Sequence, residues 1–164
     1  IINYLLHKYP QKKWVIDAGA LQMVLPQLLT NSVIITPHKG ELERLEGMIE
    51  HQNKESGEKP FDTLLKQGVS IVLKGPTDFI YSGNAVVEVK GGNAGMTKGG
   101  TGDVLAGLIA ALYCTNDKET AAVIGSYINK KAGERLAEST GPFFNASDLV
   151  EAVPKVLWEE VKNR

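Results

Sequence analysis

A glycine-rich turn that leads into an apolar segment, residues 91–113, contains the residues best suited to chemistry. Glycines at 99, 100 and 102 have no Cβ, so several backbone N–H groups can approach one anion. From about Thr101, apolar residues recur at spacings of three and four, which predicts a helix whose N-terminal end favours phosphate. Asp103 would repel that phosphate, so we expect it to act as a base or to hold a metal. The alternative is an ordinary first-turn acid beside a flexible loop.

Two common phosphate-binding motifs do not fit this turn. In a Walker loop the last glycine is followed by Lys and then Ser or Thr, whereas Gly102 is followed by Asp103 and Val104. The dinucleotide-binding spacing G-x-G-x-x-G does not occur in this stretch. Any phosphate chemistry here therefore depends on the bare amides and on Asp103.

Three further polar residues stand at or just after short apolar runs that read as strands: Asp17, His38 and Lys74. Ligands of open α/β sheets bind at the carboxyl ends of parallel strands, which favours a shared site. Each residue also has an ordinary interpretation. Asp17 could cap the following helix, His38 could be a surface residue, and the Gly-Pro pair at 75–76 could simply form a tight turn after Lys74.

The segment GGTGDVLAGLIAAL resembles the anion-binding and catalytic-base segment of the ribokinase-like superfamily. The longer run NAGMTKGGTGDVLAG, with ITPHKGE and VLKGPTD upstream of it, resembles the NAD(P)H-hydrate dehydratase branch, also called the carbohydrate-kinase-like or YjeF C-terminal family. The three motifs occur in order over most of the chain. Two positions depart from the family pattern: Gly19 stands where the second acid of Asp-Ala-Asp is usual, and Lys39 stands where Pro is common.

The resemblance implies a role for each motif. Asp103 would be the general base and would contact the substrate, as would His38 and Asn93. The backbone amides that would bind the transferred phosphate are those of Gly99, Gly100, Thr101 and Gly102. The residues that would bind the nucleotide are Lys74, Gly75, Pro76, Thr77 and Asp78. No side chain of this chain is assigned to a metal.

The implied substrate is NADH or NADPH hydrated across a ring double bond. The implied reaction is a dehydration driven by ADP or ATP, with Mg²⁺ at the phosphates, and microbial members of the family point to ADP. Two alternatives remain open. One is a small-molecule kinase of the same superfamily that acts on a sugar or vitamin precursor. The other is a fragment that binds nucleotide but is inactive alone.

Composition excludes some classes of partner. The 164 residues are 43% hydrophobic, which is enough for one core. A net charge of −1 gives no electrostatic reason to expect nucleic acid or an anionic membrane. No apolar run reaches the length of a membrane span, and the single cysteine cannot form an internal disulfide. We expect a cytoplasmic enzyme that forms a homo-oligomer or associates with a missing N-terminal portion.

Strands and helices alternate along the chain, which predicts an α/β fold. With the resemblance, we expect a three-layer αβα ribokinase-like fold whose central sheet is mainly parallel, with a β-hairpin toward one edge. The predicted strands are 13–17, 32–36, 70–74, 78–82 and 85–89. The predicted helices are 20–29, 41–46, 61–67, 101–113 and 119–138, and residues 115–117 are predicted to form a turn and the N-cap of the helix at 119–138. A last helix is predicted to be capped by Ser147, with a kink or break at Pro154. Residues 49–59 are predicted to form a polar loop.

The chain begins Ile-Ile, with an amphipathic segment already under way. The resembled domain is longer, and the matching motifs would fall in its C-terminal part. We therefore expect residues 1–164 to form a single domain that is the C-terminal portion of a longer one.

Overall fold

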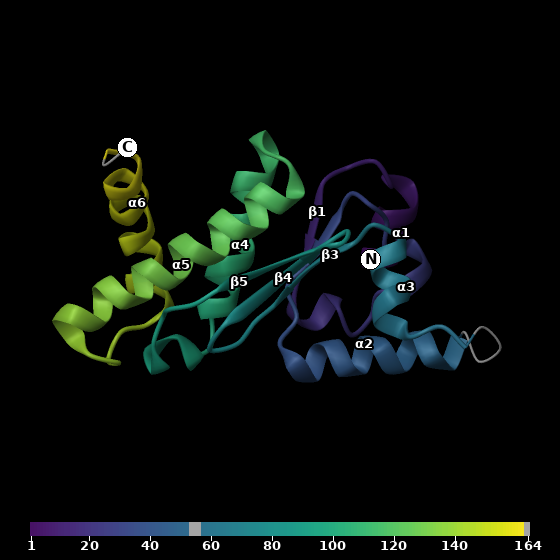
Figure 1. The fold of residues 1–164 in the computed structure, drawn as a ribbon, viewed down its shortest axis with the longest axis horizontal. Helices are drawn as coiled ribbons and strands as arrows, with labels where there is room; N and C mark the ends of the chain where they lie inside the picture. Colours follow the sequence, from purple (N-terminus) through teal and green to yellow (C-terminus); the bar gives the residue numbers. More distant parts are fainter. Residues whose placement is uncertain (53–56, 163–164) are drawn as a thin grey trace.

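The computed structural model describes residues 1–52 and 57–162 and contains one five-stranded sheet (Figure 1). The strands follow the order of the sequence across the sheet: β1 (Trp14–Ile16), β2 (Val33–Ile35), β3 (Ser70–Leu73), β4 (Asp78–Ser82) and β5 (Ala85–Val89). β1, β2 and β3 are parallel, whereas β4 is antiparallel to both β3 and β5. The prediction of parallel strands with a hairpin at one edge is confirmed.

Alternate residues of the central strands enter two separate cores, because successive side chains of a strand point to opposite faces of the sheet. Val33, Ile35 and Ile71 pack on one side, and Ile34 and Val72 pack on the other. All five are buried. The short apolar runs of the sequence are therefore strands that are covered on both faces, as a parallel sheet requires.

Helices form the two outer layers. One core is closed by α1 (Ile2–Lys8), α2 (Lys39–Gln52) and α3 (Pro60–Lys66). The other is closed by α4 (Thr101–Thr115) and α5 (Lys118–Thr140). A third core joins these two helices to α6 (Ala146–Lys162), which lies beyond them, away from the sheet. The predicted three-layer arrangement is confirmed.

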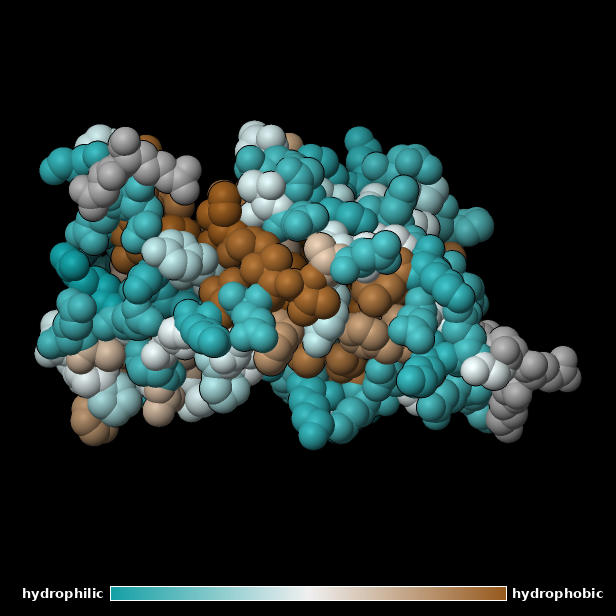
Figure 2. Space-filling model, in the orientation of Figure 1, coloured by the Kyte–Doolittle hydropathy of each residue, from teal (hydrophilic) through white to brown (hydrophobic). Residues whose placement is uncertain are grey.

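Apolar side chains also reach the surface. Figure 2 shows them gathered across the middle of the visible face, where the ribbons of α4 and of the sheet lie in Figure 1. None of the helices within 1–52 and 57–162 is long and apolar enough to cross a bilayer.

The helix predicted for residues 20–29 is wrong. The chain instead forms two short 3-10 turns, η1 (Ala18–Ala20) and η2 (Pro26–Leu28). Leu25 is extended, with ψ of 117°, as expected for a residue that precedes proline. The side chain of Asn3 holds this extended segment, because Asn3 Oδ1 accepts from the Leu25 N–H at 2.8 Å and Asn3 Nδ2 donates to the Met23 carbonyl at 2.9 Å.

Helix α2 is longer than predicted and replaces the first part of the predicted 49–59 loop. Ile49 continues the apolar face of the helix and is 2% exposed in the first core, so burial extends the helix through a polar stretch of sequence. Residues 53–56 of that predicted loop lie outside the described residues.

Two details of α6 also differ from prediction. The cap is Asn145 rather than Ser147, because Asn145 Oδ1 accepts from the N–H groups of Ser147 at 2.7 Å and Asp148 at 3.2 Å. The helix does not break at Pro154, which lies inside Ala146–Lys162, whereas a kink there stays a prediction. By contrast, the N-cap predicted before α5 is confirmed, since Asp117 Oδ1 accepts from the Thr120 N–H at 2.8 Å.

Candidate active site

The start of α4 is shaped by Gly100 and Thr101. Gly100 is the N-cap residue and has φ of 89°, a left-handed conformation that favours glycine. A Cβ at this position would lie 2.9 Å from the Cβ of Ala146, so a side chain would also collide. The Thr101 hydroxyl donates to the carbonyl oxygen of Met96 at 2.6 Å and holds the first turn against the preceding loop. The helix predicted from Thr101 onward is confirmed.

Backbone amides at this helix start are available to a ligand. No acceptor within the described ranges receives the N–H groups of Gly99, Gly100, Gly102 or Asp103, whereas the Thr101 N–H donates to the Lys98 carbonyl at 3.4 Å. The Asp103 side chain is exposed to solvent. Unpaired donors at the positive end of a helix favour an anion, as the sequence predicted for this turn.

Four side chains at the carboxyl ends of β1, β2 and β3 form what we call the Lys74 cluster: Asp17, His38, Glu41 and Lys74. Lys74 Nζ donates to Asp17 Oδ1 at 2.7 Å and lies 3.8 Å from Glu41 Oε2. The side chains of Lys74, Asp17 and Glu41 are 19%, 12% and 8% exposed. Asp17 does not cap η1 through its side chain and instead pairs with Lys74.

His38 and Glu41 cap the start of α2 reciprocally. The His38 N–H donates to Glu41 Oε2 at 2.8 Å, and the Glu41 N–H donates to His38 Nδ1 at 3.2 Å. This is a capping box in which an imidazole replaces the usual hydroxyl. Because Nδ1 accepts a hydrogen bond, the neutral imidazole carries its proton on Nε2, and the side chain is 61% exposed.

The Lys74 cluster adjoins the start of α4. A Cβ built on Gly102 would lie 3.4 Å from Lys74 Nζ and 3.8 Å from Asp17 Oδ2. Glycine at this position therefore lets the helix N-terminus approach the charged cluster closely. The structure thus brings the glycine turn together with two motifs that lie far from it in the sequence.

A second set of polar side chains, which we call the Lys130 cluster, consists of Asp78, Ser126 and Lys130. Lys130 Nζ lies 3.2 Å from Asp78 Oδ1, and the Ser126 hydroxyl donates to Asp78 Oδ2 at 2.7 Å. Asp78 and Lys130 are only 4% and 5% exposed. Both oxygens of the Asp78 carboxylate are therefore used inside the protein.

Asn93 and Glu134 tie the loop before η3 (Ala94–Thr97) to α5. Asn93 Nδ2 donates to the Gly133 carbonyl at 2.7 Å, and Asn93 Oδ1 accepts from the Gly95 N–H at 2.8 Å. Glu134 Oε1 accepts from the Gly92 N–H at 3.1 Å. The hydrogen bond from Lys131 holds the pKa of the Glu134 carboxyl below its ordinary value, and the Gly92 amide adds to that effect.

A cavity of about 820 Å³ joins these parts. Eight of the predicted site residues line it: His38, Lys74, Gly75, Pro76, Asp78, Asn93, Thr101 and Gly102. Four others are not part of its lining: Thr77, Gly99, Gly100 and Asp103. Asp103 follows Gly102 directly and faces solvent beside the cavity.

The lining residues that sequence reasoning did not assign to the site include Asn129 and Lys130, both on α5. Lys130 has the appearance of an ordinary surface lysine in a mixed helix, and only the spacing of Ser126, Lys130 and Glu134 could have indicated a buried polar face. Asn129 is 4% exposed, and its side-chain oxygen has no hydrogen-bond partner among the residues described. It is a polar group left available to a ligand or a water molecule.

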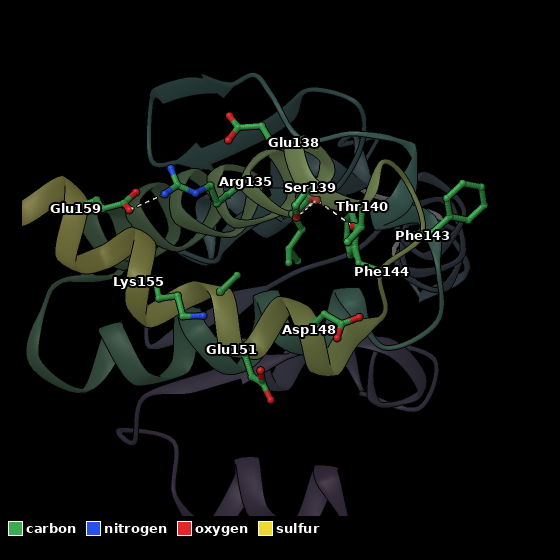
Figure 3. Close-up of a pocket in the computed structure, with 12 residues that line it drawn as sticks. Arg135, Glu138, Ser139, Thr140, Phe143, Phe144, Asp148, Glu151, Lys155 and Glu159 are labelled. Carbon is green, nitrogen blue, oxygen red and sulfur yellow. Dashed lines mark hydrogen bonds and ion pairs between the residues drawn. The ribbon is translucent and has the colours of Figure 1, made fainter.

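A second cavity, of about 680 Å³, lies between α5 and α6 (Figure 3). None of the predicted site residues lines it. Figure 3 shows Arg135 directed across the groove to Glu159, with which it forms an ion pair at 3.1 Å, while Phe143 points away. Its lining carries charges of both signs and lacks the glycine turn.

Relatives with assigned names share most of this chain. It is 40% identical over 158 residues to the bifunctional NAD(P)H-hydrate repair enzyme Nnr of Methanocaldococcus jannaschii, covering 95% of this chain and 30% of the relative. It is 38% identical over 145 residues to the ADP-dependent (S)-NAD(P)H-hydrate dehydratase of Cenarchaeum symbiosum, covering 87% of this chain and 50% of the relative. The chain therefore spans half or less of the length of these relatives.

Solved structures agree on the fold. A ribokinase-like superfamily protein from Enterococcus faecalis superposes with a TM-score of 0.74 and 27% identity, over 96% of this chain and 57% of that one. The ADP/ATP-dependent NAD(P)H-hydrate dehydratase of Bacillus subtilis, crystallised with ATP and Mg²⁺, superposes with a TM-score of 0.67 and 27% identity, over 89% of this chain and 55% of that one. The predicted ribokinase-like fold is confirmed.

A family model described as NAD(P)H-hydrate dehydratase matches residues 1–155, which include every motif discussed above. Together with the identity to the named relatives, this match shows that the chain belongs to the NAD(P)H-hydrate dehydratase family.

Proposed function

We propose that the protein containing this chain dehydrates hydrated NADH or NADPH to the reduced cofactor, with ADP or ATP as phosphoryl donor. One observation carries the proposal: the Gly102 amide at the start of α4, which has no acceptor among the described residues, lies close to Lys74 at a cavity large enough for a small ligand, and Asp103 follows it directly. The relatives support it, since their names specify hydrate repair and dependence on ADP or on ADP/ATP. ADP is the donor we favour.

The proposed chemistry begins at the ring hydroxyl of the hydrate. Asp103 accepts the hydroxyl proton while the oxygen attacks the terminal phosphorus of the donor, whose bridging P–O bond breaks. With ADP the leaving group is AMP. Inorganic phosphate then departs with the electrons of the C–O bond, the neighbouring ring carbon loses a proton, and the C=C bond forms. Phosphorylation thus converts a poor leaving group into a good one.

Backbone donors stabilise the transferred phosphoryl group in this proposal. The amides of Gly99, Gly100 and Gly102 are unpaired, and the loss of one such donor typically costs about 3 kcal/mol of transition-state stabilisation. The Thr101 amide would have to leave its long contact with the Lys98 carbonyl, at 3.4 Å, to contribute. These donors are fixed before the ligand arrives, because local contacts set the helix start.

The remaining predicted residues form the walls of the same site. The ammonium group of Lys74 would interact with the phosphates of the donor. Residues 75–77 would line the nucleotide-binding site. His38 would offer its Nε2–H to the substrate, and Asn93 would shape the loop that faces it. Asp78 would support this wall from behind, because its carboxylate is already bonded within the protein.

The Lys74 cluster fits a Mg²⁺ ion that is bound jointly by the protein and by the phosphates of the nucleotide. The described residues contain no group of three or more His, Cys, Asp or Glu side chains that could hold a metal by themselves. Mg²⁺, however, is commonly bound through one or two carboxylates together with substrate phosphates. Asp17 and Glu41 supply two carboxylates against the single charge of Lys74. Bound there, the ion would neutralise charge on the donor phosphates.

The test is the recovery of dihydronicotinamide absorbance from hydrated NADH, with Mg²⁺ and either ADP or ATP, catalysed by the protein containing this chain. We expect recovery to require nucleotide and to fall by about 10²- to 10⁴-fold in Asp103→Asn. Glu119→Gln, which changes an exposed acid in the first turn of α5, is the matched control and should retain activity. A stable phosphorylated product, without recovered absorbance, would contradict the proposal and indicate a kinase.

Association with further polypeptide remains a prediction, either as a homo-oligomer or with another portion of a longer domain. Within the described residues β1 has a strand neighbour on one side only, and an unpaired strand edge can accept another strand. The mass in solution, measured by light scattering, tests this prediction.

A further inference from the structure

One face of α5 holds two loops that border the cavity, residues 74–78 and 91–93. Ser126, Lys130, Gly133 and Glu134 are spaced by four, seven and eight residues, so they share one face of the helix. Ser126 and Lys130 bind the loop of residues 74–78. Gly133 and Glu134 bind the loop of residues 91–93.

Lys130 joins the two loops directly. Its Nζ donates to the carbonyl oxygens of Gly75 at 3.0 Å, Pro76 at 3.2 Å and Gly91 at 3.5 Å, in addition to its ion pair with Asp78. An ammonium group has three hydrogens, and these four acceptors use all of them. Lys130 therefore has no free donor for a ligand, and it can influence a ligand only through the loops.

Asp78 completes the arrangement from within its own loop. Its Oδ1 accepts from the Gly75 N–H at 2.9 Å, so the carboxylate closes the turn on itself. The first residue of this loop is held separately, because the Lys74 N–H donates to the Pro37 carbonyl at 2.8 Å. The part of the loop that the Lys130 cluster controls is therefore residues 75–77.

We propose that Lys130 and Asp78 are positioning residues that clamp residues 75–77 and 91–93 at the separation that the nucleotide requires. This inference rests on the proposed function. It assigns Asp78 to holding the loop that contacts the nucleotide, whereas the sequence predicted that Asp78 itself binds the nucleotide. Without the ammonium group, the carbonyl oxygens of Gly75, Pro76 and Gly91 lose a shared donor, and the buried Asp78 carboxylate loses its cation, which is costly. The two loops then separate, and the bound nucleotide loses its alignment with the α4 amides.

The first measurement needs no ligand. In Lys130→Met, which removes the charge and leaves the hydrocarbon stem, we expect faster hydrogen exchange at the amides of Gly75, Thr77 and residues 91–93 than in the unaltered protein. Exchange in α4 should not change. Lys155→Met, a lysine of α6 that contacts neither loop, is the control. Unchanged exchange in both loops of the Lys130 variant would overturn the proposal.

The second measurement is the ADP dissociation constant by calorimetry, together with KM for ADP and kcat. A misplacement of about 1 Å can cost on the order of 10²-fold in rate, so we expect kcat/KM for ADP to fall by up to that factor, with weaker ADP binding as part of the loss. A variant that is only less stable would retain its affinity below its melting temperature, and that result would overturn the clamp. If the unaltered protein binds neither ADP nor ATP, the proposed function fails, and hydrogen exchange still decides the clamp.

Two further single variants, Ser126→Ala and Asp78→Asn, test the proposal even if Lys130→Met does not fold. Ser126→Ala removes only the hydroxyl bonded to Asp78 Oδ2, and it should produce smaller changes in the same direction. Asp78→Asn keeps the shape of the side chain and should resemble Lys130→Met. In the double variant Asp78→Asn with Lys130→Met, the loss of affinity should be less than the product of the two single losses, because both act on one arrangement. Independent, fully multiplicative losses would contradict it.

Discussion

Each of the two lysine clusters pairs a lysine with an aspartate, but the charge around the lysine and its exposure to solvent differ between them. Lys74 lies between two carboxylates, Asp17 and Glu41, so that cluster carries an excess of negative charge when His38 is neutral. Lys130 has one carboxylate partner, and its other acceptors are neutral backbone carbonyls. The Lys74 side chain is 19% exposed and that of Lys130 is 7% exposed.

The difference indicates how a charged residue can be assigned to binding or to support. A buried lysine whose hydrogens are all used by protein acceptors has nothing to offer a ligand. A lysine that shares two carboxylates at the mouth of a cavity can exchange partners, and its spare carboxylate can attract a cation. Both residues are lysines that line the same cavity, so the count of hydrogen bonds, the net charge and the exposure distinguish them.

The largest expected effect concerns stability. Lys130→Met leaves the buried Asp78 carboxylate without its cation. Because breaking a buried ion pair typically costs about 3 to 5 kcal/mol, this variant should lower the free energy of unfolding by that amount. Lys74→Met should cost less, about 1.5 to 3 kcal/mol, because Asp17 is 12% exposed and Glu41 keeps its hydrogen bond from the His38 N–H. Urea denaturation measures both. Equal losses would remove the distinction between the clusters.

A smaller effect is expected at the helix start that borders the Lys74 cluster. Gly100→Ala places a side chain in a left-handed conformation, which costs about 1 to 2 kcal/mol, and the new Cβ would also collide with Ala146. Gly99→Ala is the matched control, since a Cβ there meets nothing within 4 Å and should change stability little. Thermal melting compares the two. A stable Gly100→Ala variant with full anion binding would show that the start of α4 is not fixed as described.

The smallest expected effect is a pH dependence of the free energy of unfolding that arises from Glu134, one turn along α5 from Lys130. Folding lowers the pKa of Glu134, through Lys131 first and the Gly92 amide second, so its stabilising contribution is fully present above the ordinary value of 4.5. It is lost as the pH falls through the lower pKa of the folded state. The group is part-exposed, so the contribution should be at most about 1 kcal/mol.

Urea denaturation between about pH 7 and pH 3 checks this dependence against Glu134→Gln. The difference in stability between the two proteins should shrink as the pH decreases. A difference that stays constant with pH would mean that the charge of Glu134 has no part in holding the 91–93 loop.

Local patterns predicted the framework of the fold. The hairpin of β4 and β5, the helix that begins at Thr101 and the N-cap Asp117 all depend on residues close together in sequence, and all are confirmed. The 20–29 segment failed in part for the opposite reason. Pro26 is a local signal that disfavours a helix at Leu25, but the contact with the Asn3 side chain, which reaches the segment from α1, is contained in no pattern within it.

The candidate site likewise contains residues that could be predicted from local sequence and residues that could not. The glycine turn and the residues that follow strands could be selected from sequence because parallel strands end at one edge of a sheet. Asp78 could not be identified as a support, because its partners Ser126 and Lys130 are about fifty residues away. Lysine at position 130 looks the same in sequence whether its ammonium faces water or three carbonyl oxygens.

The polar face of α5 also limits how the length of this helix can change. Each residue turns a helix by about 100°, so one residue inserted or deleted between Ser126 and Glu134 would rotate one half of the face away from its loop. Both loops would then lose their common support, although every residue type was retained. Additions beyond Gly141, where the helix has ended, carry no such penalty. We therefore expect the spacing within this stretch of α5 to tolerate insertions and deletions less than its ends do.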